Sequence, residues 1–460
     1  MVQITNLEPE VFEGINVAAD WIQDLKSSNS RKHKEKVIER ALIASRLGSS
    51  SAQCFLYNCY LAYNPFYVYR VKQIPETEGL ENKENPWIEF WGLLEDLRTL
   101  QHSGKRATTA IENMSVRFDS DEWNLVARPV LGKDLRSGIS TKTLNAVLKN
   151  TEWQIPVFEC QLAQDSENNA RHLSGRKWIE PKLDGVRALA VVTHSSVTMY
   201  SCSGKVLHNF EDLEKTISDN KEIFSSESKF GNRFVVDGEI VSENFQELMT
   251  QLHRKSNTNL KDAMYYIFDI IPLSHFVAGE SSIQQFYRHE IIQDIVEKLQ
   301  SRATNIKGLQ GIEVDLSTSE GHNIMHRYAK SSVDDGFEGI VIKDLNAPYT
   351  AGRSNAWLKW KPSITVDLKI VSVEEGTGRN AGRMGALICQ GQDAGREIKT
   401  NVGSGFSDSQ RDDIWKNKAE MLGRIVEIKC DSVTHNQSGT YSLRFPRFLR
   451  FRGFMPDEKI

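Results

Sequence analysis

A chain of 460 residues is too long for one hydrophobic core, so we expect two to four domains. Its 57 basic and 61 acidic side chains leave it slightly acidic, which excludes a protein that attracts nucleic acid by net charge alone; any basic surface must be local. Apolar residues make up 39% and charged residues 26%, which indicates a globular rather than a disordered chain.

The sequence predicts neither a secreted nor a membrane protein. Its first residues carry Glu8, Glu10 and Glu13 and lack the basic-then-apolar pattern of a signal peptide. The uncharged run 47–69 contains serines, asparagines and a proline, too many polar groups for hydrocarbon, so we interpret it as buried or partner-facing structure. The six cysteines form no C-x-x-C pair, which indicates neither a zinc ribbon nor a disulfide framework and favours a reducing cytoplasm.

Residues 1–150 are predicted to form an all-α domain. One helix is expected over 36–47, and another follows Pro86, a residue that a first helical turn tolerates. The apolar residues of the second helix recur at near-helical spacing: Trp87, Phe90, Trp91, Leu94 and Leu97. A further helix is expected over 141–148, for which Ser140 is a good N-cap.

Two further domains are predicted, an α+β domain over 151–363 and a small β-barrel of the OB type over 364–460. The α+β domain contains a polar stretch, 165–173, which we expect to be a loop, and then alternates short β-rich runs with helical ones. Its strands are expected over 188–192, 197–201 and 234–236, and its helices over 211–224 and 286–300. Glycine-rich turns separate the strands of the barrel, which are expected over 368–373, 386–390 and 425–430.

The strongest chemical signal is the segment Glu180-Pro181-Lys182-Leu183-Asp184-Gly185-Val186-Arg187, which leads into an apolar strand. A lysine amine attacks phosphorus only when it is unprotonated, so it needs nearby cations or desolvation. Gly185 lets backbone approach a phosphate, and Arg187 supplies charge and paired donors. For this segment alone, the alternative is a surface turn.

This segment resembles the Lys-x-Asp-Gly-x-Arg motif of ATP-dependent DNA ligases, RNA ligases and mRNA capping enzymes, in which the lysine accepts the nucleotide. Further motifs follow in the order of that superfamily. Asp237-Gly238-Glu239 resembles an Asp-Gly-Glu motif and implies that Glu239 contacts metal or ribose. Tyr266-Ile267-Phe268-Asp269 implies that Phe268 stacks on adenine. A turn explains the first of these motifs equally well in isolation, and an ordinary apolar strand explains the second.

Two motifs contribute the remaining charged groups of the nucleotide site. The segment 335–343 resembles a Glu-Gly-hydrophobic-x-Lys motif, which implies that Glu338 is a second metal ligand and that Lys343 contacts the nucleotide. Glu180, two residues before the acceptor lysine, is also implied to contact the nucleotide. In the segment 353–362, Lys359 and Lys361 would project from one face of a strand and neutralise a phosphate. A solvated strand with alternating lysines is the alternative.

The segment 444–452 resembles the C-terminal ligase element that orients the leaving pyrophosphate, which implies this role for Arg452. Asp457 and Lys459 would belong to the same element, in a more extended form than usual. The arginines alternate with aromatic residues, so Arg447 and Arg450 are predicted to contact a DNA backbone. An edge strand with basic residues is the alternative.

One position departs from the family pattern. Where a Ser-Arg-x-Gly element is expected, the sequence reads Ser201-Cys202-Ser203-Gly204. In the family the arginine contacts the nucleotide or its phosphate. Cys202 therefore implies either that another arginine makes this contact or that activity is reduced.

The resemblance extends from about Lys177 to the C-terminus. More loosely, the helical region is similar to the DNA-binding domain of T-even phage ligases, which implies a phosphate site at Lys133, Arg136 and the helix N-terminus at Ser140; an ordinary capped helix is the alternative. The family implies a monomeric enzyme of DNA replication, repair and recombination, here of phage origin. It would use ATP and Mg²⁺ to seal nicked double-stranded DNA through a lysyl-AMP at Lys182 and a DNA-adenylate.

Three other classes are weighed against this one. Capping enzymes and RNA ligases share the lysine motif, but capping enzymes use GTP and lack a helical DNA-binding domain in front. NAD-dependent ligases would bring a cysteine-rich zinc module, which this sequence lacks. A non-catalytic DNA-binding relative would be expected to have lost Lys182, Glu239 or Glu338, and all three are present.

Overall fold

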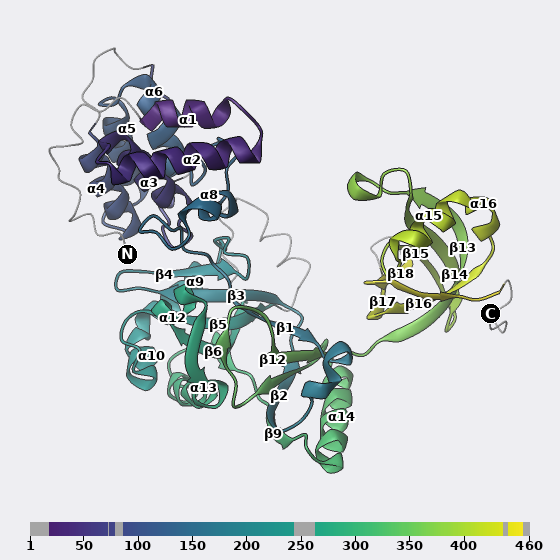
Figure 1. Cartoon of the computed structure of the whole chain (residues 1–460). Coiled ribbons are helices and arrows are strands. Elements are labelled where there is room, and N and C mark those ends of the chain that lie inside the picture. The colour runs from purple at the N-terminus through teal and green to yellow at the C-terminus, as the bar shows by residue number, and fades with distance from the viewer. Residues whose placement is uncertain (1–17, 72, 79–85, 243–262, 436–439, 454–460) are drawn as a thin grey trace. The chain divides into compact units, whose positions relative to one another are not determined.

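The computed structural model describes residues 18–71, 73–78, 86–242, 263–435 and 440–453 (Figure 1). These residues form two compact units. The first unit contains the described residues up to Gln164 together with those of Asp184–Gln310 and Lys343–Trp357, and the second contains Asp165–Leu183, Gly311–Ile342 and the described residues from Leu358 onward. The predicted fold class is confirmed: a helical region is followed by an α+β region and a C-terminal OB-like sheet.

The helical region is built from short helices around one apolar core. Its helices are α1 (Ala18–Lys26), α2 (Arg31–Arg46), α3 (Ser50–Tyr63), α4 (Trp87–Arg98), α5 (Gly104–Ser115), α6 (Ser120–Glu122), the π-turn η3 (Trp123–Ala127), α7 (Arg128–Leu131) and α8 (Thr141–Leu148). The fully buried side chains of this core include Phe55, Trp87, Phe90, Phe118 and Trp123. The helices expected over 36–47, after Pro86 and over 141–148 are therefore confirmed.

The uncharged run contains helix α3, which is buried on nearly all sides. From Cys54 to Ala62 every residue of this helix is buried, so a charged side chain anywhere along it would lose its hydration. Its one buried amide, Asn58, accepts a hydrogen bond from the indole N–H of Trp91 at 3.3 Å and donates to the carbonyl of Cys54 at 3.0 Å. The interpretation of the run 47–69 as buried structure is confirmed for helix α3, whereas Leu47 at its start is 83% exposed.

The α+β region contains two five-stranded sheets. The first has the order β4-β3-β5-β6-β8, with β4 (Val197–Ser201), β3 (Val186–Val192), β5 (Phe234–Val241), β6 (Met264–Pro272) and β8 (Ile306–Gly308). The second has the order β1-β12-β10-β2-β9, with β1 (Gln161–Asp165), β12 (Gly352–Trp360), β10 (Gly339–Asp344), β2 (Arg176–Lys182) and β9 (Ile312–Asp315).

A two-stranded ribbon and several helices complete this region. The ribbon pairs β7 (Glu280–Gln284) with β11 (Pro348–Thr350). The helices are α9 (Glu211–Asp219), α10 (Lys221–Ser228), α12 (Leu273–Ala278), α13 (Gln285–Leu299) and α14 (Ser319–Asp334). Apolar side chains of α9, α10 and α13 share one core with β3, β5 and β6, while α14 packs with β2, β9 and β10.

The C-terminal region is a seven-stranded sheet with the order β17-β18-β15-β14-β13-β16-β19. Its elements are β13 (Ile364–Glu375), β14 (Met384–Asp393), β15 (Arg396–Val402), β16 (Ile425–Cys430), β17 (Ser432–His435), β18 (Tyr441–Arg444) and β19 (Arg447–Phe451), with α15 (Asp408–Lys416), α16 (Lys418–Met421) and the 3₁₀ turn η5 (Gly378–Asn380). The edge strand β19 curls back, because the Phe448 amide donates to the carbonyl of Ser404 at 2.9 Å. Gly405 follows with φ +91°, where a Cβ would lie 2.4 Å from the Phe448 carbonyl oxygen.

Some predicted boundaries differ from the structure. The stretch 165–173, expected to be a loop, contains the 3₁₀ helix η4 (Glu167–His172). The helix expected over 211–224 is two helices, because Asn220 leaves helical geometry at φ −110° and ψ 14° and ends α9. Asp457 and Lys459 lie outside the described residues. None of the helices in the described part of the chain is long and apolar enough to cross a membrane.

Glu122 is an acidic side chain buried in the helical core. Its carboxylate accepts a hydrogen bond from the backbone N–H of Ala19 at 3.0 Å, and only 1% of the residue is exposed. Burial raises the pKa of Glu122 from 4.5 to about 7; the Ala19 N–H opposes this shift, and the charges of Asp119 and Asp20 add to it. The folded protein therefore binds one more proton than the unfolded chain between these two values, so its stability falls as pH rises through that range.

We predict that Glu122→Gln removes this pH dependence. The amide oxygen still accepts from Ala19 but carries no charge, so the variant should match the wild type near pH 4.5 and exceed it by roughly 2–3 kcal/mol above pH 7. Urea unfolding between pH 4.5 and 8 measures the difference. Parallel stability profiles for the two proteins would contradict the prediction.

Candidate active site

Lys182, the predicted nucleophile, ends strand β2 and lies beside Glu338. Its Nζ is 2.6 Å from Oε2 of Glu338, and the backbone N–H of Glu338 donates to the Lys182 carbonyl at 2.9 Å. Glu338 directly precedes β10, the neighbour of β2 in its sheet. Sheet pairing thus brings together two residues that are more than 150 positions apart in the sequence.

The Glu338 carboxylate also contacts two further cations. Lys361 Nζ lies 2.6 Å from Oε2, and the Arg444 guanidinium lies 2.9 Å from Oε1. The glutamate side chain is only 10% exposed, so water screens these contacts weakly. The adjacent Gly339 has φ +143°, and a Cβ there would lie 2.2 Å from the carbonyl oxygen of Trp360, which explains why glycine follows the glutamate.

The paired lysines face the same cavity of about 620 Å³, as their predicted spacing requires. Lys359 is in β12 and Lys361 follows its end. Lys429 and Arg447 line the same cavity. Glu180, two residues before Lys182, is buried, and its Oε2 accepts a hydrogen bond from the indole N–H of Trp178 at 3.2 Å.

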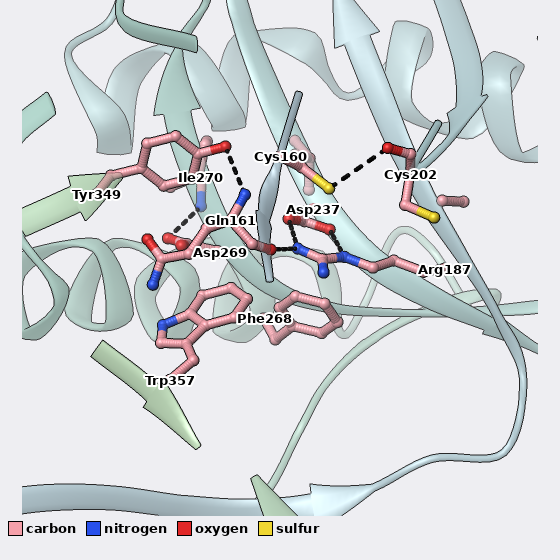
Figure 2. A network of polar contacts seen from close by, with 12 residues as sticks. Cys160, Gln161, Arg187, Cys202, Asp237, Phe268, Asp269, Ile270, Tyr349 and Trp357 are labelled. Carbon is pink, nitrogen blue, oxygen red and sulfur yellow. Dashed lines mark hydrogen bonds and ion pairs between the residues drawn. The ribbon is translucent and has the colours of Figure 1, made fainter. Parts of the chain in front are cut away.

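In the first unit, Arg187 forms a two-pronged ion pair with Asp237 (Figure 2). Its Nε and Nη2 lie 3.0 and 2.7 Å from the two carboxylate oxygens, and Nη2 also donates to the Gln161 carbonyl at 2.7 Å. Burial raises the pKa of the Asp237 carboxyl, and the Arg187 charge opposes this shift. The pairing satisfies both buried charges and fixes the plane of the guanidinium.

Asp237, Gly238 and Glu239 lie inside a continuous strand rather than in the turn that was their alternative interpretation. Strand β5 runs past the predicted end at residue 236 to Val241, and Glu239 is directly opposite Arg187 on β3. A Cβ on Gly238 would lie 2.6 Å from the carbonyl oxygen of Tyr266. The glycine is therefore required by the close approach of β6.

Phe268 belongs to an aromatic pair flanked by cations. Its ring lies 5.9 Å from that of Trp357 in an edge-to-face arrangement. Figure 2 shows Arg187, Phe268 and Trp357 close together, with the Arg187 guanidinium 5.7 and 5.4 Å from the two ring centroids. Lys343 Nζ lies 4.5 and 4.7 Å from the same centroids. Lys343 also donates to the Phe268 carbonyl at 3.2 Å. Such a cluster suits a flat, electron-rich ligand.

Cys202 lies in the turn after β4, and its side chain is exposed. Its carbonyl accepts a weak hydrogen bond from the thiol of Cys160 at 3.7 Å (Figure 2). That another arginine of the chain makes the nucleotide contact in place of Cys202 stays a prediction.

The residues predicted to bind DNA in the helical region have different environments. Lys133 donates to the carbonyls of Leu61 and Asn64 at 2.8 Å each, and burial lowers its pKa to about 7. Its ammonium thus stabilises the C-terminal end of α3, a contact that the prediction did not foresee. Arg136 is exposed, with its backbone N–H bonded to Asp134. Ser140 accepts from the Thr143 N–H at 3.3 Å, which confirms the predicted cap.

Three of the C-terminal arginines, Arg447, Arg450 and Arg452, are paired with acidic side chains of the C-terminal region. Arg447 contacts Asp431 at 2.8 Å and Arg450 contacts Glu427. Arg452 contacts Glu427 at 3.1 Å and Asp367 at 3.2 Å. The side chain of Arg450 is 62% exposed and that of Arg452 only 16%, so Arg450 is the more accessible to a backbone phosphate.

Several residues of these clusters were not identified as functional from the sequence. Asp237 was noted only as part of a motif, and Trp357 and Arg444 only as members of matched segments. The polar partners depend on pairings between distant strands, which a single sequence does not reveal. The alternation of arginine with aromatic residues was the one available signal for Arg444. Within the described residues, no group of three or more His, Cys, Asp or Glu side chains is arranged to hold a metal ion.

The lysine beside a carboxylate at a strand end and the OB-like sheet that follows agree with the nucleotidyltransferase class, which the family comparison shows. Residues 159–361 match the ATP dependent DNA ligase domain, and residues 375–452 match the DNA ligase OB-like domain. The solved structure named Pmar-Lig_PreS3 is 38% identical, over 95% of this chain and 99% of that chain, with a TM-score of 0.64. The chain therefore belongs to the ATP-dependent DNA ligase family.

Archaeal relatives agree with this assignment over a shorter length. "DNA ligase 2" of Methanosarcina acetivorans is 26% identical over 334 residues, which is 65% of this chain and 55% of the relative. "DNA ligase" of Methanocaldococcus jannaschii is 25% identical over 410 residues, which is 78% of this chain and 68% of the relative. The chain thus spans little more than half the length of the first of these relatives.

We predict that Arg187→Met destabilises the protein strongly, because it leaves the Asp237 carboxylate buried without its partner. The expected loss is about 3–5 kcal/mol of unfolding free energy. The double variant Arg187→Met/Asp237→Asn lacks both charges and should recover at least half of that loss. Guanidinium unfolding of the three proteins provides the measurement. A double variant as unstable as the single one would show that the ion pair is not the cause.

Proposed function

We propose that this protein is an ATP-dependent enzyme that seals nicks between a 3′-hydroxyl and a 5′-phosphate in duplex DNA. The observation that carries the proposal is the cluster of Lys182, Glu338 and Lys361, which places a nucleophilic lysine beside a carboxylate and a second ammonium. Family membership supports the use of ATP and the ligase reaction. The substrate and the steps below are part of the proposal.

In the first step, Nζ of Lys182 attacks the α-phosphorus of ATP. A nitrogen–phosphorus bond forms, and the bond from the α-phosphorus to the bridging oxygen breaks, so that pyrophosphate leaves with the bonding electrons. An ammonium has no lone pair, so Lys182 must first leave Glu338 and lose a proton. Lys359 and Lys361 are proposed to neutralise phosphate charge as it develops.

Other residues are proposed to hold the nucleotide in place. Phe268 would stack on the adenine, and Arg187 and Lys343 flank the phenylalanine ring. Arg452 would orient the pyrophosphate. Glu180 would also contact the nucleotide.

Glu239 and Glu338 are the proposed ligands of Mg²⁺. Carboxylate oxygens suit this ion. Glu338 is held by three cationic side chains, so it would bind Mg²⁺ only once the phosphate groups of ATP pair with those cations. When bound, Mg²⁺ supplies positive charge that neutralises phosphate oxygens.

Two further transfers complete the proposed reaction. The 5′-phosphate at the nick attacks the phosphorus of lysyl-AMP, which breaks the nitrogen–phosphorus bond and gives DNA-adenylate. The 3′-hydroxyl then attacks the 5′-phosphorus, and AMP leaves as the phosphodiester forms. Arg136, Ser140, Arg447 and Arg450 are the proposed DNA contacts, while Lys133 has less support because its ammonium is bonded inside the helical region.

The wider setting is also part of the proposal. The three domains would be 1–150, 151–363 and 364–460, and the enzyme would act as a cytoplasmic monomer in DNA replication, repair and recombination. The two relatives described above are archaeal and give no support to the predicted phage origin.

We predict that Lys182→Arg abolishes the covalent intermediate. The guanidinium keeps the positive charge next to Glu338, but it is not nucleophilic at any accessible pH. Incubation with ATP labelled at the α-phosphate should mark the wild type and leave the variant unmarked, and only the wild type should join a nicked duplex. Labelling of the variant would refute Lys182 as the acceptor.

A nicked duplex that already carries AMP on its 5′-phosphate separates chemistry from folding. Sealing of this substrate does not need the amine of Lys182, so Lys182→Arg should still join it. A variant that neither labels nor seals the adenylated nick would show that the substitution disrupts more than the first step. Wild-type protein that seals neither substrate would refute the proposed function.

A further inference from the structure

A fully buried arginine outside the proposed active-site residues lies at the centre of a polar network in the first unit. Arg288 is on helix α13 and has no exposed surface. Its Nε donates to Asp269 at 2.8 Å, its Nη2 donates to the side-chain oxygen of Gln285 at 2.8 Å, and its Nη1 donates to the carbonyl of Ile283. A buried charge with three specific acceptors is costly to desolvate, so its geometry calls for an explanation.

One end of the network fixes the strand that carries Phe268. Asp269 is the next residue on β6 and is also fully buried. Its Oδ1 accepts from both Arg288 and the backbone N–H of Ile270, the latter at 2.9 Å (Figure 2). Asp269 lies opposite Asp237 on the neighbouring strand, and this like charge raises the pKa of Asp237, after burial as the main cause. Each aspartate therefore needs an arginine of its own.

The other end fixes Trp357, on a strand of the other sheet. The indole N–H of Trp357 donates to the same Gln285 oxygen at 2.7 Å, and this bond is buried. Gln285 Oε1 thus receives one bond from Arg288 and one from Trp357. The guanidinium is connected through Asp269 to the backbone beside Phe268, and through Gln285 to the ring of Trp357.

These two aromatic rings are the edge-to-face pair flanked by Arg187 and Lys343. We propose that Arg288, acting through Asp269 and Gln285, is a positioning residue that holds Phe268 and Trp357 as one rigid wall for the adenine base. This inference rests on the proposed function, since it concerns the affinity for the base of ATP. Arginine suits the role because its fixed fork reaches two acceptors at once, whereas a lysine is a single point charge.

The test compares a ligand that has a base with one that lacks it. The rate of lysyl-AMP formation is measured against ATP concentration, and inorganic tripolyphosphate is used as a competing inhibitor. Gln285→Met removes the buried bond to the indole while keeping similar volume, and Trp357→Phe removes the indole N–H while keeping an aromatic ring. Each should raise the half-saturating ATP concentration about fivefold, the equivalent of one hydrogen bond, and leave inhibition by tripolyphosphate unchanged within about twofold.

Three further variants make the test specific. The double variant Gln285→Met/Trp357→Phe should lose less ATP affinity than the sum of the two single variants, because both changes remove the bond between Gln285 and Trp357. Arg288→Lys keeps the charge beside Asp269 but cannot also reach Gln285, and it should show the same selective loss of ATP affinity. Tyr265→Phe is the control: it removes a buried hydroxyl from the same strand, bonded to the Ala188 and Val236 carbonyls at 2.9 and 2.8 Å, and should leave the ratio of ATP to tripolyphosphate affinity unchanged.

Equal weakening of ATP and tripolyphosphate in the Gln285 and Trp357 variants would overturn the inference, because it would indicate general damage to the fold. Unchanged ATP affinity in both variants would overturn it as well. Both of these results leave the proposed function intact, since they are obtained with a wild type that forms lysyl-AMP. Absence of lysyl-AMP in the wild type would instead refute the proposed function and, with it, the inference.

Discussion

The carboxylate of Glu338 is the contact on which the catalytic part of the second unit depends. It faces three cations that come from separate segments, Lys182, Lys361 and Arg444. Asp431 also lies 3.6 Å from Lys361 and 2.8 Å from Arg447, so two carboxylates face four cations and the cluster retains an excess of positive charge in a weakly screened environment. Such an excess favours a polyanion, and the same glutamate keeps the lysines close together until that anion arrives.

In the first unit, by contrast, two buried aspartates are each paired with one arginine. Asp237 and Asp269 lie opposite each other on adjacent strands, and each is bonded to an arginine, Arg187 and Arg288 respectively. Two unpaired carboxylates there would repel each other in a medium that water does not reach. With both aspartates paired, the sheet carries an aromatic pair that Arg187 and Lys343 flank.

Much of the fold could be predicted from local patterns, because helix periodicity, helix caps and strand alternation depend on residues that are close together in the sequence. The cap at Ser140 and strands 197–201 and 425–430 were predicted to the residue. The break at Asn220 was missed, since both flanking helices share one apolar pattern. Motif order identified the residues around Lys182, but not the partners supplied by pairing between distant strands, such as Gln161 for Arg187 or Gln285 for Trp357. A single sequence carries no record of which strands become neighbours.

The unusual Cys202 has a practical consequence. All six cysteines lie within the described residues, and the other five are buried, whereas Cys202 is exposed in the turn after β4. Burial raises the pKa of each of the five, from Cys54 to Cys430, so their thiolates are scarce as well as inaccessible. A thiol-selective fluorophore should therefore label the native chain at one position, giving an optical reporter in the turn Ser201-Cys202-Ser203-Gly204, with no engineered substitution.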